Sequence, residues 1–365
     1  MIDIEKPKYQ KLKEYLTDKI RSQEWMTGDK ICSENELAEQ FSISRHTVRQ
    51  AISELAADGW LYKVQGKGTF VDRRPDKQVA STKTIGVITT YLGDYIFPSI
   101  IRGIDSVLSM NGYNIILGCT YNQHEKEHTC LENMLNQRID GLIVEPTKSA
   151  LPNPNAYMYR ELSNNSIPVL FIHGLYKELE YSYVLEDDVQ AGYIAAKHLI
   201  DQGHRTLGCI FKMDDIQGHK RFQGYQQALK EAGLVLADSN VIWFDTENAE
   251  TIFVGEGKKR LDTIFEKCSA IVCYNDQIAL KVMDVIRSKE MSVPEDISLI
   301  SFDDSQLAVA SEVKLTTVAH PKEKLGEEAA KAIIQMAERS CNYFDIQIQP
   351  ELVVRESVKN QKMEE

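Results

Sequence analysis

Long hydrophobic runs are missing from this sequence: no stretch of eighteen or more residues is continuously apolar, so no transmembrane helix is expected. Residues 1–13 are polar and charged, unlike a signal peptide. The 7 cysteines are scattered and form no Cys-x-x-Cys pair, which is typical of reduced thiols rather than of disulfides or a zinc ribbon. These absences predict a cytoplasmic protein without a membrane partner.

Positive charge is also scarce, because the net charge of the chain is −12, and this at first disfavours a nucleic-acid partner. The charge is unevenly distributed, however. Residues 1–74 hold 13 Lys and Arg against 12 Asp and Glu, and residues 41–74 hold 6 against 3. The excess of acid therefore lies in the rest of the chain, where it discourages nonspecific binding to DNA without excluding a basic surface near the N-terminus.

A length of 365 residues is enough for two or three domains, and the first of them is small and mainly helical. Apolar residues recur with helical spacing over residues 8–22. Ser33 and Glu36 have the spacing of a capping box that begins a second helix. Ser44 is placed to cap a third helix that ends near residue 58. Two helices joined by a short turn predict a helix-turn-helix, whose second helix enters the major groove of DNA.

The third predicted helix carries the side chains expected to bind DNA. Arg45 and Arg49 are four residues apart and share a face, and the guanidinium fork suits guanine edges or phosphates. His46 and Thr47 lie in the first turn, where free backbone N–H groups favour a phosphate. Two short strands follow, and the glycines between them permit a tight tip that approaches the minor groove. The pattern predicts a winged helix-turn-helix.

Residues 33–41, 44–51 and 65–71 resemble the winged helix-turn-helix of GntR-type bacterial regulators. The resemblance implies a homodimer that binds palindromic, double-stranded operator DNA. It also implies that the arginines of the third helix read DNA and that the wing enters the minor groove. Lys8 of the first helix and Glu34 of the second are expected to lie near the DNA backbone. The residues expected to bind DNA are Lys8, Glu34, Arg45, His46, Thr47, Arg49, Gln65, Gly66, Lys67 and Gly68.

After a polar linker at residues 73–83, short apolar runs alternate with amphipathic helical segments. Strand–helix alternation predicts parallel sheets covered by helices, and two series of similar length predict two lobes with a cleft between them. The predicted strands are 85–88, 115–117, 141–144 and 169–172 in the first series, and 207–211, 241–243, 270–273 and 297–300 in the second. The predicted helices include 100–108, 191–202, 222–232 and 278–289.

Ligands bind at the carboxyl ends of the strands in open parallel sheets, so the residues that follow each strand are candidates. Carboxylates and an arginine suit vicinal hydroxyl groups, and a flat aromatic ring covers the apolar face of a sugar. The candidate ligand-binding residues are Thr90, Tyr95, Phe97, Glu145, His173, Asp187, Arg221, Asn275 and Asp303. Three other acids have competing explanations: Asp276 is expected to cap its helix, and Asp188 and Asp304 are either ligands or simple caps and surface acids.

Residues 84–88, 97–104, 140–143, 187–204, 221–225, 273–276 and 301–305 resemble the effector domain of LacI/GalR-type repressors. The resemblance implies the periplasmic sugar-binding fold with three crossings between lobes. It implies that Arg221, Asn275 and Asp303 bind ligand, and that aromatic residues near Phe97 line the cleft.

The expected fold class is multidomain: an α+β winged helix-turn-helix at residues 1–72, then an α/β periplasmic-binding-protein-like domain of two doubly wound lobes at 84–365. Lobe 1 is expected at about 84–186 and 316–340, and lobe 2 at about 187–315 and 341–358. A GntR-type head on a LacI/GalR-type effector domain resembles the arabinose-responsive repressors of Gram-positive bacteria. This implies L-arabinose as effector, arabinose-catabolism promoters as targets and no cofactor. Physics alone leaves other pentoses and hexoses open.

Two enzymatic interpretations compete with a repressor. His124, Glu125 and His128 spell His-Glu-x-x-His, a zinc-hydrolase signature, but the segment is nearly all charged and reads better as the solvated face of a surface helix. GntR-type heads also occur on aminotransferase-like bodies, which need a Schiff-base lysine and a much longer chain. We therefore expect a protein that is not an enzyme and holds no metal.

Overall fold

The computed structural model describes residues 8–21, 24–26, 28–57, 59–64, 68–71, 81–93, 96–176, 178–338, 341 and 343–363. The chain forms two compact units, Met1–Thr82 and Lys83–Glu365, which we call the head and the effector domain. Most of the predicted linker lies outside the described residues. Every helix within them is too short or too polar to cross a membrane.

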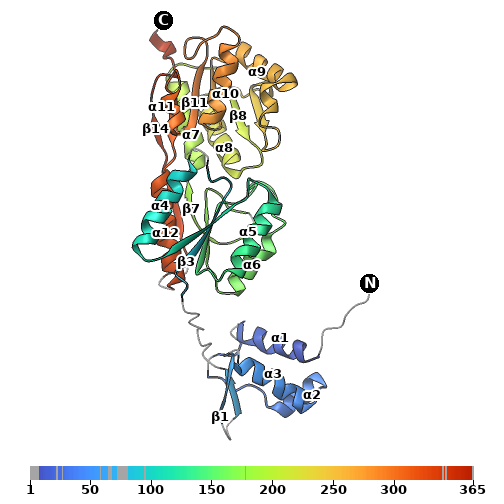
Figure 1. Ribbon diagram of the computed structural model, residues 1–365. Helices are drawn as coiled ribbons and strands as arrows, with labels where there is room; N and C mark the ends of the chain where they lie inside the picture. The colour runs from blue at the N-terminus through green and yellow to red at the C-terminus, as the bar shows by residue number, and fades with distance from the viewer. Residues whose placement is uncertain are drawn as a thin grey trace. The chain divides into compact units, whose positions relative to one another are not determined.

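Within the described residues, the head consists of three helices and a two-stranded sheet (Figure 1). Its elements are α1 (Lys8–Arg21), α2 (Glu34–Phe41), α3 (Arg45–Ala57), β1 (Leu61–Val64) and β2 (Gly68–Val71). The strands pair antiparallel, and Lys30 adds an isolated bridge to Phe70. The predicted capping box is confirmed, because Ser33 accepts from the backbone of Glu36 while the Glu36 carboxylate accepts from the backbone of Ser33.

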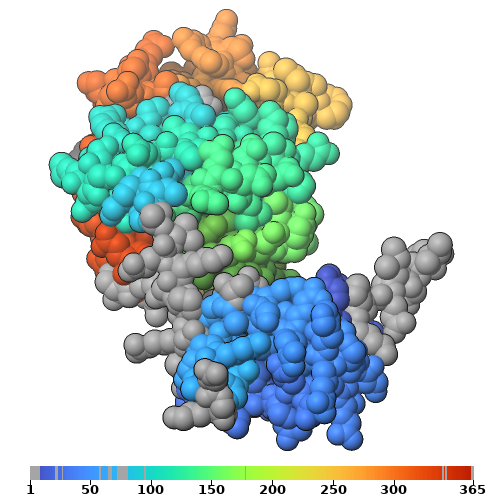
Figure 2. Space-filling view, turned by 60° about the horizontal axis from the view of Figure 1, so that its bottom comes forward, coloured from blue at the N-terminus to red at the C-terminus, as the bar shows by residue number. Residues whose placement is uncertain are grey.

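The head has a hydrophobic core of its own, and Figure 2 shows its described residues as a closely filled body. Leu12 and Leu16 from α1, Leu37 from α2 and Ile52 from α3 are fully buried in that core. Fully burying such a side chain contributes about 1.5–3 kcal/mol, so a few of them suffice to hold three short helices together.

The first lobe of the effector domain is built on a six-stranded parallel sheet in the order β13-β7-β6-β5-β3-β4. Figure 1 shows α4 and α12 on one face of this sheet and α5 and α6 on the other. The elements are β3 (Thr84–Thr89), α4 (Phe97–Met110), β4 (Asn114–Cys119), α5 (His124–Asn136), β5 (Gly141–Val144), α6 (Ala156–Asn164), β6 (Val169–Ile172), β7 (Ser182–Glu186), α12 (Lys322–Ala337) and β13 (Asp345–Ile348).

Helices on both faces explain why the central strands are apolar without alternation. In β5, Ile143 packs into the core beneath α4 and α12, whereas Leu142 and Val144 pack into the core beneath α5 and α6. In β6, Leu170 and Phe171 divide between the same two cores. Every residue of these strands is therefore buried, and the prediction of doubly wound sheets is confirmed.

The second lobe has a six-stranded sheet in the order β14-β12-β11-β10-β8-β9, in which β14 alone runs antiparallel to its neighbour. Its elements are α7 (Asp188–Asp201), β8 (Leu207–Lys212), α8 (Ile216–Glu231), β9 (Val241–Phe244), α9 (Gly255–Lys267), β10 (Ala270–Cys273), α10 (Asp276–Arg287), β11 (Ser298–Asp303), α11 (Gln306–Ala310), β12 (Thr316–Ala319) and β14 (Glu351–Val353). The part of the chain that the structure describes also holds three short 3-10 helices, at Asp238–Asn240, Thr251–Phe253 and Gln361–Met363.

The structure corrects the predicted lobe boundaries at two places. Strand β12, expected in lobe 1, pairs with β11 in the second sheet. Strand β13, expected in lobe 2, pairs with β7 in the first sheet. Strand β13 lies at a sheet edge and is partly exposed, whereas β12 is buried but begins with two threonines, so neither strand gives a strong hydrophobic signal. The chain therefore crosses between the lobes after β7, after β12 and after β13.

Candidate functional site

The third helix of the head presents its predicted DNA-binding side chains to solvent. Arg45, His46 and Arg49 are exposed, while Val48 on the opposite face is fully buried. Ser44 accepts a hydrogen bond from the backbone of Thr47 at 3.1 Å, so it caps this helix as predicted. Contact of these side chains with DNA stays a prediction.

Arg49 is held in place by a neighbour from α2. Its Nε and Nη2 donate to Glu34 Oε2 at 3.2 and 3.0 Å, and this fork leaves 64% of the arginine side chain exposed. The hydrogen bond and charge of Glu34 raise the pKa of Arg49 above its ordinary value. Glu34 therefore orients Arg49, and a contact of Glu34 itself with DNA stays a prediction.

The wing is described only in part. Gln65, Gly66 and Lys67, and the side chain of Lys8, lie outside the described residues. Gly68 has φ +122°, a backbone conformation that favours glycine, whereas the group closest to a Cβ there is the end of the Lys30 side chain, which can move.

A cavity of about 260 Å³ lies between the two lobes of the effector domain. Seven of the nine predicted ligand-binding residues line it: Thr90, Phe97, Glu145, His173, Arg221, Asn275 and Asp303. They stand at or just beyond the carboxyl ends of strands or on the helices that follow, as the strand-end rule predicts. Tyr95 lies outside the described residues, and Asp187 does not line the cavity. Whether any of these residues binds a ligand stays a prediction.

Arg221, on α8, is the most enclosed charge in the cavity wall. Its Nε donates to Asp188 Oδ1 at 2.9 Å, its Nη1 donates to the carbonyl of Tyr274 at 2.9 Å, and its Nη2 lies 3.9 Å from Asp303 Oδ1. Burial lowers the pKa of Arg221, but the carboxylates around it outweigh burial and raise the pKa above its ordinary value. The guanidinium is therefore a fixed, permanently charged donor.

A second group on the first lobe is centred on Glu145. Its Oε2 accepts from both the backbone N–H and the hydroxyl of Thr90, at 2.6 and 2.7 Å. Its Oε1 lies 3.0 Å from His173 Nδ1. Burial lowers the pKa of His173, but the hydrogen bond and charge of Glu145 more than offset it, so the pKa lies above its ordinary value.

The opposite wall carries two ionised groups, Lys212 and Asp215, that the predicted site omitted. Lys212 ends β8, and Asp215 accepts hydrogen bonds from the Tyr274 hydroxyl at 2.5 Å and from Ser149 at 2.9 Å. Burial opposes ionisation of both groups. The charges of Asp215 and Asp214 outweigh burial and raise the pKa of Lys212, while the charge of Lys212 and hydrogen bonds from Tyr274, the backbone of Gln217 and Ser149 outweigh burial and lower the pKa of Asp215.

Two of the lining residues have left-handed backbones. His173 has φ +64° and Asp303 has φ +99°. Non-glycine residues adopt this region infrequently, and such conformations gather at functional sites because the surrounding structure has to hold them. Both stand at the ends of strands and face the cavity.

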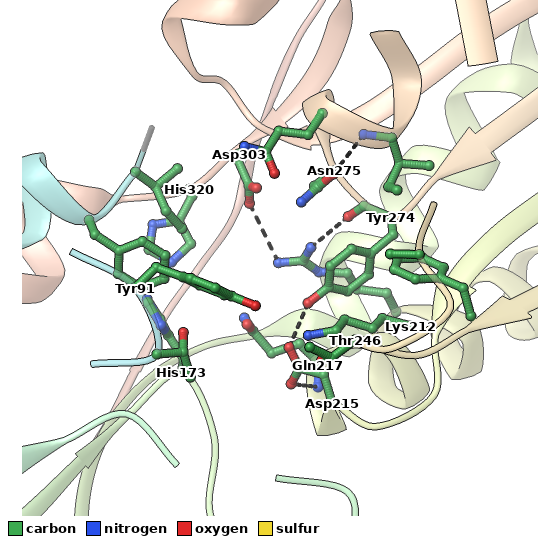
Figure 3. A pocket seen from close by; sticks show the side chains of 18 of the residues that line it. Tyr91, His173, Lys212, Asp215, Gln217, Thr246, Tyr274, Asn275, Asp303 and His320 are labelled. Carbon is green, nitrogen blue, oxygen red and sulfur yellow. Dashed lines mark hydrogen bonds and ion pairs between the residues drawn. The ribbon is translucent and has the colours of Figure 1, made fainter. Parts of the chain in front are cut away.

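Other lining residues were not among the predicted ligand-binding residues. The most polar of them are Tyr91, Lys212, Asp215, Gln217, Tyr274 and His320. Figure 3 shows two groups across the cavity, Tyr91, His173 and His320 on one side and Lys212, Tyr274 and Asn275 on the other. The strand-end rule applied one residue further would have found Tyr91. His320 follows β12, which the sequence did not predict.

Comparison with known proteins covers both units. A family model described as bacterial regulatory proteins, gntR family, matches residues 8–71, and one described as a periplasmic binding protein-like domain matches residues 196–358. An arabinose metabolism transcriptional repressor from Halalkalibacterium halodurans is 45% identical over 98% of this chain and 98% of its own length. A protein of the same name from Geobacillus stearothermophilus is 44% identical over 97% and 98%.

The chain belongs to the family of arabinose metabolism transcriptional repressors. Among solved structures, the transcription regulator CcpA of Lactococcus lactis is similar, with a TM-score of 0.67 and 26% identity over 76% of this chain and 99% of that one. The repressor therefore combines a GntR-type head with a LacI-type effector domain, and it is a DNA-binding regulator rather than an enzyme.

Within this repressor, the His-Glu-x-x-His segment is only in part the solvated helix face that the sequence suggested, since Glu125 and Lys126 are exposed but one residue between the two histidines is buried. Glu127, inside the motif, is fully buried and accepts hydrogen bonds from Tyr159 at 2.8 Å, Tyr176 at 2.5 Å and Asn155 at 2.8 Å. Among the described residues, no three His, Cys, Asp or Glu side chains are arranged to hold a metal. The segment anchors the first lobe instead.

The ambiguous acids of the second lobe also receive definite roles. Asp187, predicted as a ligand, caps α7 by accepting from the backbone of Gln190, and Asp188 binds Arg221 instead. The predicted cap of α10 is wrong by one residue, because the cap is Asn275.

Asp276 is a buried acceptor rather than a cap. Hydrogen bonds from Ser301, Ser305 and Thr317 converge on its carboxylate. Burial, helped by the charge of Asp303, raises the pKa of Asp276 to about 6. Asp304 does not line the cavity, and its carboxylate lies 2.6 Å from Arg355.

Proposed function

We propose that this repressor binds L-arabinose between its lobes and that the sugar releases it from operator DNA. The observation that carries the proposal is the cavity, in which polar groups from both lobes converge within a chain that is 45% identical to an arabinose metabolism transcriptional repressor. The small, mixed set of donors and acceptors suits a neutral polyhydroxy ligand and requires no cofactor.

The chemistry of the wall supports a sugar. Glu145 and Asp303 offer acceptors on opposite lobes, while Arg221 and Lys212 offer fixed donors. Phe97, which also lines the cavity, provides a flat apolar surface for the C–H face of a sugar ring. A ligand that satisfies both walls at once favours the arrangement in which the lobes are close together.

On the DNA side, we propose a homodimer that binds a palindromic operator in the cytoplasm. A two-fold axis in the protein pairs with a two-fold axis in the operator, and each head occupies one half-site. Sugar binding changes how the two heads are held, so the half-site spacing no longer fits. The sugar shifts this equilibrium only by its difference in affinity for the two states.

Calorimetric titration tests this proposal. The purified protein is titrated with L-arabinose, D-xylose, D-galactose and D-ribose, first alone and then with operator-like DNA bound. We expect L-arabinose to bind, and to bind more weakly when DNA is present, because linkage makes the antagonism reciprocal.

Two results would contradict it. If none of the four sugars bound, the proposal that the cavity binds a sugar would be wrong. If L-arabinose bound more tightly in the presence of DNA, the sugar would strengthen operator binding rather than release it. Preference for one of the other three sugars would retain the repressor but replace its effector, which is the second candidate because these sugars differ only in hydroxyl geometry.

A further inference from the structure

His320 lies where the cavity meets one of the crossings between the lobes. It follows β12 of the second sheet and precedes α12, which packs on the first. Its backbone N–H donates to the carbonyl of Asp303 at 3.4 Å, and its own carbonyl accepts from the backbone of Lys322 at 2.8 Å. A ligand that contacts His320 therefore contacts the segment that joins β12 of the second lobe to α12 of the first.

The imidazole of His320 is 4% exposed, and neither ring nitrogen has a hydrogen-bond partner within the described residues. Buried polar atoms are nearly always hydrogen-bonded. The ring lines the cavity, and Figure 3 shows it beside that space. The cavity is therefore the place from which a partner for these nitrogens has to come.

His173 stands next to His320 on the same wall. The two ring centroids are 4.9 Å apart, with the rings nearly perpendicular. Nδ1 of His173 is hydrogen-bonded to Glu145. Nε2 of His173 is buried and has no partner among the described residues. Three imidazole nitrogens without a partner among the described residues are thus gathered at one side of the cavity, across from Asn275 (Figure 3).

The charge state of His320 indicates what its partner is. Burial lowers the pKa of His320 well below its ordinary value, and the nearby charges of His173, Lys322 and Arg221 lower it further. At neutral pH the ring is therefore uncharged, with one nitrogen that donates and one that accepts. A hydroxyl group also donates and accepts, whereas a carboxylate or phosphate ligand offers only acceptors.

We propose that His320 binds one hydroxyl of the sugar directly and helps to determine which sugar the pocket accepts, with Nε2 of His173 contacting a neighbouring hydroxyl. The inference rests on the proposed function, since it concerns the same cavity. It adds a specificity-determining residue on the crossing segment, a position from which ligand contact is transmitted to both lobes.

The test removes the imidazole nitrogens and the sugar hydroxyls in turn. His320→Phe keeps a ring of similar size without polar atoms, and His320→Asn keeps a polar atom near the place of Nδ1. Each variant of the full chain is titrated calorimetrically with L-arabinose and with its four monodeoxy pyranose analogues. His204→Phe is the matched control, because His204 is also buried but bonds Ser269 and the carbonyl of Lys359 instead of lining the cavity.

We expect His320→Phe to weaken L-arabinose binding about tenfold to a hundredfold, since the sugar hydroxyl is left without its partner. The loss should nearly vanish for the one analogue that lacks the contacted hydroxyl, and His320→Asn should lose less than His320→Phe. His204→Phe should show no such dependence on the analogue.

Unchanged affinity in His320→Phe would overturn the inference. An equal loss for every analogue would also overturn it, because that pattern indicates a structural role. If the unaltered protein binds a different one of the four sugars, the proposed effector fails and the comparison is made with the monodeoxy series of that sugar. If it binds none of them, both the proposed function and this inference fail.

Discussion

Glu127 is a carboxylate buried in the first lobe, and its donors tie three elements together. Tyr176 is the most informative of them, because its hydroxyl also contacts the backbone of Thr147, in the loop that follows β5. Glu127 therefore supports the loop that begins at Glu145 and runs along the cavity. Burial opposes the charge of Glu127, but hydrogen bonds from its neighbours outweigh burial and lower its pKa below the ordinary value.

Glu127→Gln should therefore destabilise the effector domain in a pH-dependent way. We expect a loss of about 1–3 kcal/mol in the free energy of unfolding at neutral pH, because buried donors lose their acceptor. Because the folded-state pKa is lowered, this stability is present above the ordinary pKa of a glutamate and is lost as the pH falls through the folded-state value. The gap between wild type and variant should narrow in acid.

Thermal unfolding of both proteins at several pH values measures this gap. Glu125→Gln is the matched control, since Glu125 is exposed, lies two residues away on the same helix and undergoes the same change of charge. Equal melting temperatures of Glu127→Gln and wild type at neutral pH would show that the buried network contributes nothing.

A substitution of Arg49 is expected to affect DNA binding without affecting the stability of the head. Its ion pair with Glu34 is solvent-exposed, and exposed pairs contribute little to folding. Arg49→Ala should therefore abolish operator binding while leaving the melting temperature and the sugar affinity unchanged. Arg287→Ala is the control, because Arg287 is an equally exposed arginine paired with two carboxylates on the effector domain.

Electrophoretic mobility shift with the operator and calorimetry with the sugar read out the two effects. Retention of normal operator affinity by Arg49→Ala would mean that α3 is not the reading helix. Loss of sugar affinity in the same variant would mean that the change is not confined to the head.

At the scale of elements, the helix pair α7 and α8 owes its close approach to two glycines. A Cβ on Gly192 would lie 1.9 Å from the carbonyl oxygen of Arg221, and a Cβ on Gly224 would lie 1.9 Å from that of Val189. Each helix therefore places a glycine against the backbone of the other, and α8 in turn places Arg221 at the cavity.

Gly192→Ala should push α8 away from α7 and displace Arg221. We expect overpacking to cost about 1–3 kcal/mol of stability and sugar affinity to fall with it. Thermal unfolding and calorimetry measure the two losses. Gly93→Ala is the control, because nothing lies within 4 Å of a Cβ built there. An unchanged sugar affinity in Gly192→Ala would show that Arg221 tolerates the shift or does not bind sugar.

Elements were predictable where burial is complete. Central strands such as β5 and β6 are apolar throughout because helices cover both faces, and their sequence signal is correspondingly strong. The edge strand β13, Asp-Ile-Gln-Ile, is partly exposed and alternates with polar residues, so it was placed in the wrong lobe. Helix α8 begins six residues before its predicted start, because Asp215 caps it at the rim of the cavity.

The site was predictable to the extent that it follows strand order. Glu145, His173 and Asp303 come at the ends of strands, a position that the sequence reveals. Asp188 and His320 reach the same region only because the chain crosses between the lobes, and that depends on how two sheets are placed against each other. Partnership between distant segments, such as Arg221 with Asp188, is a property of the whole domain rather than of either motif.

At the scale of the whole effector domain, hydrogen bonds of Asn122 and Ser149 join the first lobe to the second beside the cavity, and we call these contacts the rim. Asn122, from the first lobe, donates through Nδ2 to Asp214 Oδ2 at 3.2 Å and to Thr246 Oγ1 at 2.5 Å in the second. The Ser149 hydroxyl donates to Asp215 at 2.9 Å and accepts from the backbone N–H of Ile216. Since Asp215 also lines the cavity, the rim and the ligand site share a residue.

Asn122→Ala should therefore favour separation of the lobes and weaken every ligand that bridges them. Loss of the rim contact should reduce L-arabinose affinity about threefold to tenfold, the scale expected for a net hydrogen bond, and raise the sugar concentration needed to release operator by the same factor. Operator affinity without sugar should stay unchanged or rise. Asn111→Ala is the control, because Asn111 is exposed and its Nδ2 donates to the carbonyl of Val107 on the preceding helix rather than to the other lobe. Asn122→Ala could instead bind sugar as tightly as wild type and still need more sugar to release operator. That result would contradict a role of Asn122 in holding the lobes together, and would mean that its contacts affect how sugar binding changes the heads.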